Sequence, residues 1–225
     1  MNKMGWNRKK KEEAGEQDVA KQEESRQDKA AARRKRMKIV FLRNLAGVLA
    51  IMWMCIIFAF SAQTKEESGA VSNSFTYQIV SSTRTFFNLD LSDARVKEIA
   101  DAIEGFVRKA AHMTEFGVLS VLLFIWIGQW EMGLLRRGLT ASGAAAVYAA
   151  TDEIHQLFVP GRAGRFSDVC IDSAGAVLGV VVFVLIVKLI TVIRTLREKR
   201  EARRLCKVQA EPVEQTQQTE EAAED

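Results

Sequence analysis

The stretch VCIDSAGAVLGVVVFVLIVKLITVI, residues 169–193, decides the fold class of this chain. It is apolar almost throughout and exceeds the roughly 20 residues that an α-helix needs to cross the hydrocarbon core of a bilayer. Asp172 lies near its start. Lys188 lies near its end, where its long side chain can reach the membrane surface. The stretch therefore predicts a transmembrane helix.

Two other stretches have the same character. Residues 39–60 contain LAGVLAIMWMCIIFAF, and residues 110–130 contain GVLSVLLFIWIG. The first begins only after a long charged segment and is too long for the apolar part of a signal peptide. We therefore interpret it as a retained membrane anchor.

A fourth span, residues 139–159, is rich in Ala and Gly but carries Asp152, Glu153 and His155. An Asp at the centre of a membrane helix costs roughly 2.5–3.5 kcal/mol on insertion, so this segment would insert poorly alone. Its small residues favour close packing, and we expect it inside the bundle. The predicted fold class is an all-α integral membrane bundle of about four transmembrane helices.

Lysine and arginine beside the spans predict the orientation. Basic residues precede the first span, separate the second from the third (LLRRG), and follow the fourth. These regions share one side of a four-span protein, so both termini are expected in the cytoplasm. Residues 1–38 are then a charged leader, disordered or loosely helical, and residues 194–225 a charged tail. We expect the basic segments to meet anionic membrane lipids and no nucleic acid.

The outer loop, residues 61–109, is expected to be partly helical. Ser92 can cap a helix that begins at Asp93. An apolar stripe at helical spacing follows, formed by Val96, Ile99, Ala100, Ile103 and Val107. Such a helix would lie on the outer membrane surface and lead into the second span. Phe75, Ile79 and Phe86 indicate a second, weaker surface helix before it.

Ionisable and polar residues gather at the outer ends of the predicted helices. Helical spacing places them on shared faces, while Glu153 points about 100° away from Asp152. Gly175 and Gly179 form a GxxxG pair that permits close helix contact, including contact in a homodimer. The cluster comprises Gln63; Arg108, His112 and Glu115; Asp152, His155 and Gln156; Arg162 and Arg165; Asp168 and Asp172.

Three interpretations of the cluster stay open. The acids can pair with Arg108, Lys109, Arg162 and Arg165 and lock the bundle. Alternatively, Gln63, Arg108, Gln156, Arg162 and Arg165 can bind an anion, for which the outer leaflet offers lipid head groups or lipid-linked cell-wall intermediates. Thirdly, the cluster can be catalytic, with candidates His112, Glu115, Asp152, His155, Asp168 and Asp172, of which the first four can also bind a metal.

Residues 152–179, DEIHQLFVPGRAGRFSDVCIDSAGAVLG, closely resemble the signature of the VanZ-like family. FSAQ at residues 60–63 and the block from Arg108 to Gly117 resemble two further motifs of that family. In these, Ala62 replaces a Ser and Phe116 replaces the more usual Tyr. The resemblance covers roughly residues 39–193. It implies a bacterial multi-pass membrane protein of a family named for an accessory protein of teicoplanin resistance, and it implies no known reaction or cofactor.

Three functions follow as expectations. The first is a protein of the cell envelope whose outward polar site influences teicoplanin tolerance by binding or acting on envelope components. The second is an interfacial enzyme, a hydrolase or transferase acting on a phosphorylated or lipid-linked substrate. A transporter ranks last, because four spans are few and no inverted repeat is present.

Overall fold

The described part of the chain forms five α-helices. The computed structural model describes the backbone of residues 3–221 and the side chains of residues 22–23 and 25–205, and this part of the chain has no strand. The all-α prediction is therefore confirmed over these residues. The helices are α1 (Lys3–Ser61), α2 (Lys65–Phe86), α3 (Asp93–Ile127), α4 (Leu134–Gln156) and α5 (Phe166–Glu221).

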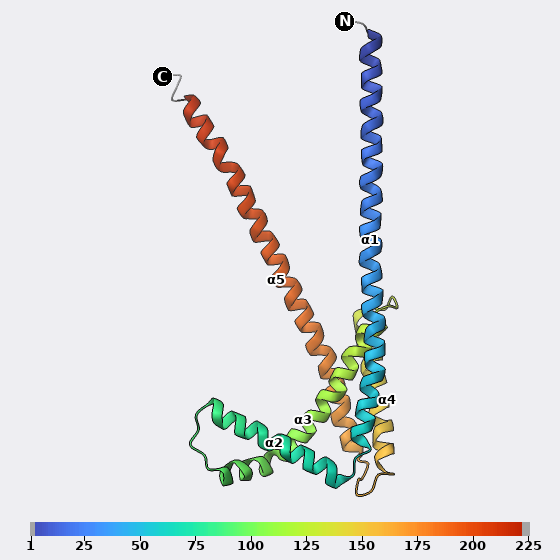
Figure 1. The fold of residues 1–225 in the computed structure, drawn as a ribbon, viewed down its shortest axis with the longest axis vertical. Helices are drawn as coiled ribbons and strands as arrows, with labels where there is room; N and C mark the ends of the chain where they lie inside the picture. Colours follow the sequence, from blue (N-terminus) through green and yellow to red (C-terminus); the bar gives the residue numbers. More distant parts are fainter. Residues whose placement is uncertain (1–2, 222–225) are drawn as a thin grey trace.

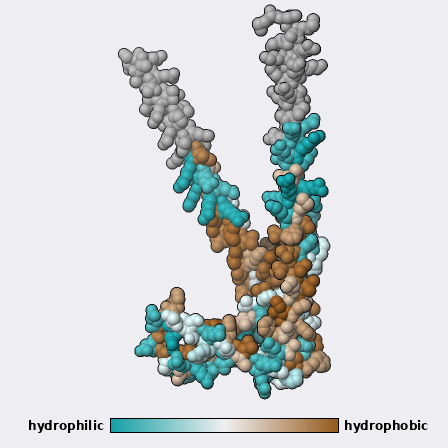
Figure 2. All heavy atoms as spheres, in the orientation of Figure 1, coloured by the Kyte–Doolittle hydropathy of each residue, from teal (hydrophilic) through white to brown (hydrophobic). Residues whose placement is uncertain are grey.

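Three helices contain segments that are long and apolar enough to cross a membrane: Ser25–Ser61 of α1, Asp93–Ile127 in α3, and Phe166–Leu205 of α5. Figure 2 shows their apolar side chains as one band between hydrophilic zones. The helix α4 does not meet this criterion, in keeping with its Asp, Glu and His. It packs against α3, α5 and α1. The crossing of a membrane by α4 stays a prediction.

The helix α3 is the centre of the fold, because it contacts each of the other four helices. The helices α1 and α5 both pack on α3 and diverge towards the two termini, which lie at the same end of the molecule (Figure 1). The short helix α2 and the beginning of α3 extend sideways at the opposite end (Figure 1). One continuous helix, α1, joins most of the charged leader to the first apolar stretch.

Glycines bring α3 and α5 into close contact. A Cβ atom on Gly175 would overlap backbone atoms of Met113, and one on Gly179 would lie 2.5 Å from the carbonyl oxygen of Gly117. The hydroxyl oxygen of Ser120 lies 2.7 Å from the carbonyl oxygen of Ala176 across the same contact. The close contact predicted for the glycine pair is thus made with α3 of the same chain. The homodimer through this face stays a prediction.

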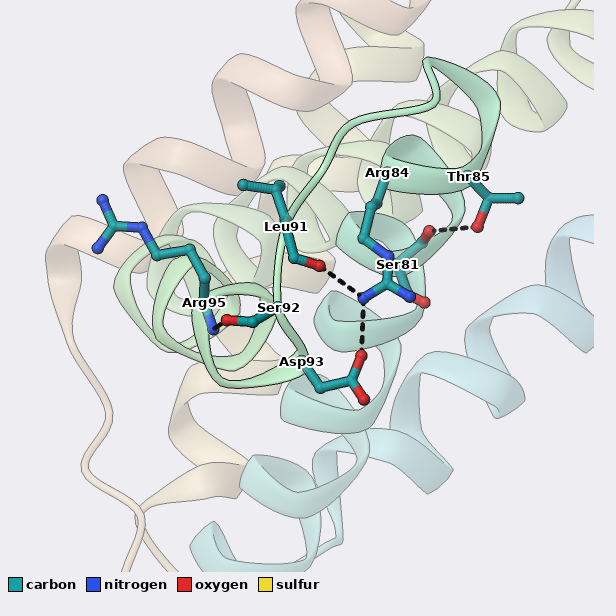
Figure 3. Close-up of polar contacts among 7 residues, drawn as sticks. All are labelled: Ser81, Arg84, Thr85, Leu91, Ser92, Asp93 and Arg95. Carbon is teal, nitrogen blue, oxygen red and sulfur yellow. Dashed lines mark hydrogen bonds and ion pairs between the residues drawn. The ribbon is translucent and has the colours of Figure 1, made fainter.

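The corner between α2 and α3 is held by its polar residues (Figure 3). As the sequence predicted, α3 begins at Asp93 with Ser92 as its N-cap, and the Ser92 hydroxyl accepts a hydrogen bond from the Arg95 backbone N–H. The Arg84 guanidinium donates to the carbonyl oxygen of Leu91 at 3.1 Å and to the Asp93 carboxylate at 2.7 Å. This corner fixes how α2 folds back along α3, where Val80 packs on buried residues of the apolar stripe.

A capping box that was not predicted from the sequence starts α2. The Thr64 hydroxyl accepts from the Glu67 backbone N–H, and the Glu67 carboxylate accepts from the Thr64 backbone N–H at 2.9 Å. These bonds from Thr64 lower the pKa of the Glu67 carboxyl. The box sets the direction in which the chain leaves α1, and so places Lys65 and Ser68 beside the other helices.

Candidate functional site

A polar pocket of about 200 Å³ lies at the end of the bundle opposite the termini. The start of α2, the middle of α3, the end of α4, the α4–α5 loop and the start of α5 all contribute to it. Basic residues outnumber acidic ones along its walls. The charged and polar lining residues are Lys65, Arg108, Lys109, Arg162 and Arg165; Glu153, Asp168 and Asp172; and Ser68, His112 and Gln156.

Arg162 ties the α4–α5 loop to the end of α1. Its Nε donates to the carbonyl oxygen of Gln63 at 3.1 Å, and a terminal guanidinium nitrogen lies 3.4 Å from the carbonyl oxygen of Phe60. Phe60 lies in the last turn of α1 and Gln63 lies just beyond it. Carbonyls at the end of a helix lack the usual partners of the helix interior, so an arginine is well suited to them. Partial burial lowers the pKa of the Arg162 guanidinium, and the Asp152 carboxylate opposes that shift. Gln63 therefore joins the site through its backbone.

Glu153 lines the pocket, although it was not part of the cluster predicted from the sequence. Its carboxylate accepts a hydrogen bond from the Arg165 backbone N–H at 2.8 Å, and only 8% of the residue is exposed. Glu153 and Asp152 are consecutive residues of α4 and therefore point in different directions. However, the α4–α5 loop folds back past α4, so that Gly164 lies close to the Glu153 carbonyl oxygen. The signal in the sequence was a glutamate near the end of a helix that precedes a Gly-rich loop. Such a glutamate can accept hydrogen bonds from the backbone N–H groups of the loop.

Asp152 and Gln156 face the interior at the end of α4, as their spacing predicted. The Gln156 side-chain amide donates to one Asp152 carboxylate oxygen at 3.0 Å, and both residues are buried. The other carboxylate oxygen of Asp152 and the hydroxyl of Ser61 are buried with no hydrogen-bond partner among the described residues.

The predicted face of Arg108, His112 and Glu115 divides in two. Nδ1 of His112 lies 3.4 Å from the Glu115 carboxylate, while Arg108 lies 3.7 Å from Glu104, one turn earlier in α3. Arg108 and His112 line the pocket, but Glu115 does not. The backbone carbonyl of Glu115 accepts from the indole N–H of Trp53 at 2.9 Å, which joins this part of α3 to α1.

His155 lies away from the pocket. Its ring packs on that of Phe58 with centroids 4.3 Å apart, and its Nδ1 is buried without a hydrogen-bond partner in the described part of the chain. The two histidines of the chain therefore have different surroundings. Only His112 lines the cavity, because a step of three residues from Asp152 carries His155 round α4 towards α1.

The described side chains include no group of three or more His, Cys, Asp or Glu residues that could hold a metal ion. The metal candidates His112, Glu115, Asp152 and His155 accordingly do not assemble into one. The position of His155 against Phe58 is one physical reason.

The acidic residues in and beside the pocket form no ion pairs with arginine or lysine among the described side chains. Asp172 is only 4% exposed. Among the described side chains, no Arg or Lys forms an ion pair with Asp152, Glu153, Asp168 or Asp172. The ion-pair network expected from the sequence is therefore not present in this part of the chain. Glu153, Asp168 and Asp172 instead border an open cavity.

The substitution Asp172→Asn is expected to leave the free energy of unfolding unchanged or to raise it, because it removes a buried charge that has no ion-pair partner. Arg162→Ala should instead lower stability by about 1–3 kcal/mol, since backbone carbonyls lose their donors. Thermal unfolding in detergent measures both variants. A marked loss of stability in Asp172→Asn alone would favour the ion-pair lock.

The family described as VanZ/LLP1 matches residues 46–188, more than half of the chain. The match includes α4, the α4–α5 loop and all the residues that line the pocket. No curated protein and no solved structure matches the chain.

Proposed function

Because the chain belongs to the VanZ/LLP1 family, we propose that it is a multi-pass protein of the cell membrane whose outward-facing pocket binds an anionic group of an envelope component. Binding of that component influences tolerance of the glycopeptide teicoplanin. The protein crosses the membrane four times, with spans near residues 39–60, 110–130, 139–159 and 169–193. Both termini lie in the cytoplasm.

The distribution of charge supports this orientation. Arg136 and Arg137 open α4 at the end of the bundle that also carries the termini, and basic residues follow the apolar part of α5. Cytoplasmic ends of membrane helices are enriched in Lys and Arg. Arg162 and Arg165 lie at the other end, where positive charge does not aid insertion. A local task in ligand binding accounts for them.

A cysteine at Ala163, in a chain whose three native cysteines are replaced by serine, is expected to react with an impermeant thiol reagent in intact cells. Ala163 is exposed and borders the pocket. The matched control is Gly133→Cys, in the exposed turn before α4, which should react only after lysis. The reverse pattern would invert the orientation.

One observation carries the binding proposal: an open pocket with five basic side chains and three acidic ones along its walls. Lys65, Lys109 and Arg165 form no ion pair with the described residues, so their charges are available to an incoming anion. Arginine can hold a phosphate or carboxylate with two parallel hydrogen bonds. The polar, partly enclosed site strengthens such contacts relative to bulk water.

Calorimetric titration of the purified, full-length protein with inorganic phosphate tests this proposal. We expect saturable binding to the wild type that Arg165→Gln weakens. A wild-type protein that takes up no phosphate at any concentration would count against the proposal.

The second candidate function is that of an interfacial hydrolase or transferase. The observation in its favour is His112, which lines the pocket and lies beside Glu115, an arrangement suited to general acid–base catalysis. Glu153, Asp168 and Asp172 border the same cavity. Loss of turnover of a phosphorylated lipid in His112→Ala, with phosphate binding retained, would favour this function over binding alone.

A further inference from the structure

An apolar groove of about 380 Å³ runs along the contact between α3 and α5. Its volume lies within the range of roughly 300–1,000 Å³ that is usual for sites that hold small ligands. Its lining includes Met113, Gly117 and Val121 on α3, and Gly175, Leu178 and Val182 on α5.

Glycine creates this groove. Gly117, Gly175 and Gly179 line it without side chains, and the helix backbones approach so closely there that no Cβ fits on Gly175 or Gly179. Larger residues stand on either side, among them Leu178, which is 53% exposed, and Val182, which is 44% exposed. The groove is therefore open along its length to whatever surrounds the apolar band of the molecule.

The groove continues the polar pocket. Lys109 lines the pocket and Met113, four residues later on α3, lines the groove. On α5, Ile171 lines the pocket and Gly175, four residues later, lines the groove. Residues four apart lie on one face of a helix, about one turn from each other. The two cavities thus follow the same helix contact, the polar one at the end of the bundle and the apolar one directly beyond it.

We propose that the α3–α5 groove holds a hydrocarbon chain of an anionic phospholipid whose phosphate group occupies the polar pocket. This inference rests on the proposed function and specifies its ligand class. The basic side chains of the pocket lie about one helical turn from an uncharged, laterally open groove. In a phospholipid, the phosphate is likewise only a few covalent bonds away from the acyl chains. The groove offers no charged side chain, so its occupant there is apolar.

The experiment compares two probes on the purified full-length protein in detergent: dioleoyl phosphatidylglycerol, which has chains, and inorganic phosphate, which has none. Leu178→Trp fills the groove. Its matched control is Val177→Trp, because Val177 is 52% exposed but does not line the groove. Val182→Trp with Val181→Trp, at 44% and 46% exposed, repeats the comparison further along α5.

We expect Leu178→Trp and Val182→Trp to weaken phosphatidylglycerol binding about tenfold, a loss of about 1.4 kcal/mol, and to leave phosphate binding unchanged. The two control variants should match the wild type with both probes. Equal lipid affinity in groove and control variants, with phosphate still bound, would overturn the groove inference and leave the pocket proposal standing. If the wild type bound neither probe, both proposals would be wrong.

Discussion

Replacement of Gly175 by alanine is expected to lower the free energy of unfolding by about 1–3 kcal/mol, the usual cost of overpacking. The added Cβ would overlap the backbone of Met113 on α3, and a backbone cannot turn aside as a flexible side chain can. For a chain of this size, that loss corresponds to a fall in thermal midpoint of roughly 2–12 °C. Gly175→Leu should prevent assembly of the bundle.

The matched control is Gly143→Ala in α4. An added Cβ at Gly143 meets no atom within 4 Å, so this variant should be at least as stable as the wild type. Thermal unfolding and size-exclusion chromatography in detergent measure both variants. If Gly175→Ala were as stable as Gly143→Ala, the α3–α5 contact would be looser than the structure has it.

The second large effect is expected at Arg165. Arg165→Gln should weaken phosphate binding by roughly 10–100-fold, because a hydrogen bond to a charged group contributes about 1.5–3 kcal/mol. Stability should change little, since the side chain is exposed and the bond to Glu153 is made by the Arg165 backbone N–H, which glutamine keeps.

Arg136→Gln is the control for removal of one positive charge, because Arg136 is exposed at the far end of α4 and does not line the pocket. In a deletion strain, the wild type and Arg136→Gln should restore the original teicoplanin susceptibility, whereas Arg165→Gln should not. Full restoration by Arg165→Gln, together with normal phosphate affinity, would contradict the proposal that Arg165 binds an anion.

The sequence predicted the features that depend on local chemistry. Ser92 could be recognised as the cap of α3 because capping involves neighbours a few residues apart. The apolar spans and the glycine pair followed from composition and spacing. Asp152 and Gln156 also followed from helical periodicity, and the hydrogen bond between their side chains agrees with it.

The features that spacing missed depend on how separate segments meet. Periodicity grouped His155 with Asp152, but it could not show that Phe58 of α1 would lie against the histidine ring. Periodicity also left Glu153 out of the predicted cluster. The α4–α5 loop returns past α4 and brings the Arg165 backbone N–H to Glu153, and the periodicity of α4 alone does not predict this path. Likewise, the presence of both acids and bases suggested ion pairs, whereas the basic residues come from α2, α3 and the α4–α5 loop and border a cavity.

The attachment of Arg162 to the last carbonyls of α1 has a mechanical consequence. The helix α1 is continuous from Lys3 to Ser61, so a change in its inclination displaces the carbonyl of Phe60, which Arg162 contacts. Membrane helices adjust their tilt to the thickness of the surrounding bilayer. Arg162 also lines the pocket, so in a membrane a change in the tilt of α1 would be transmitted to the pocket wall through one guanidinium group.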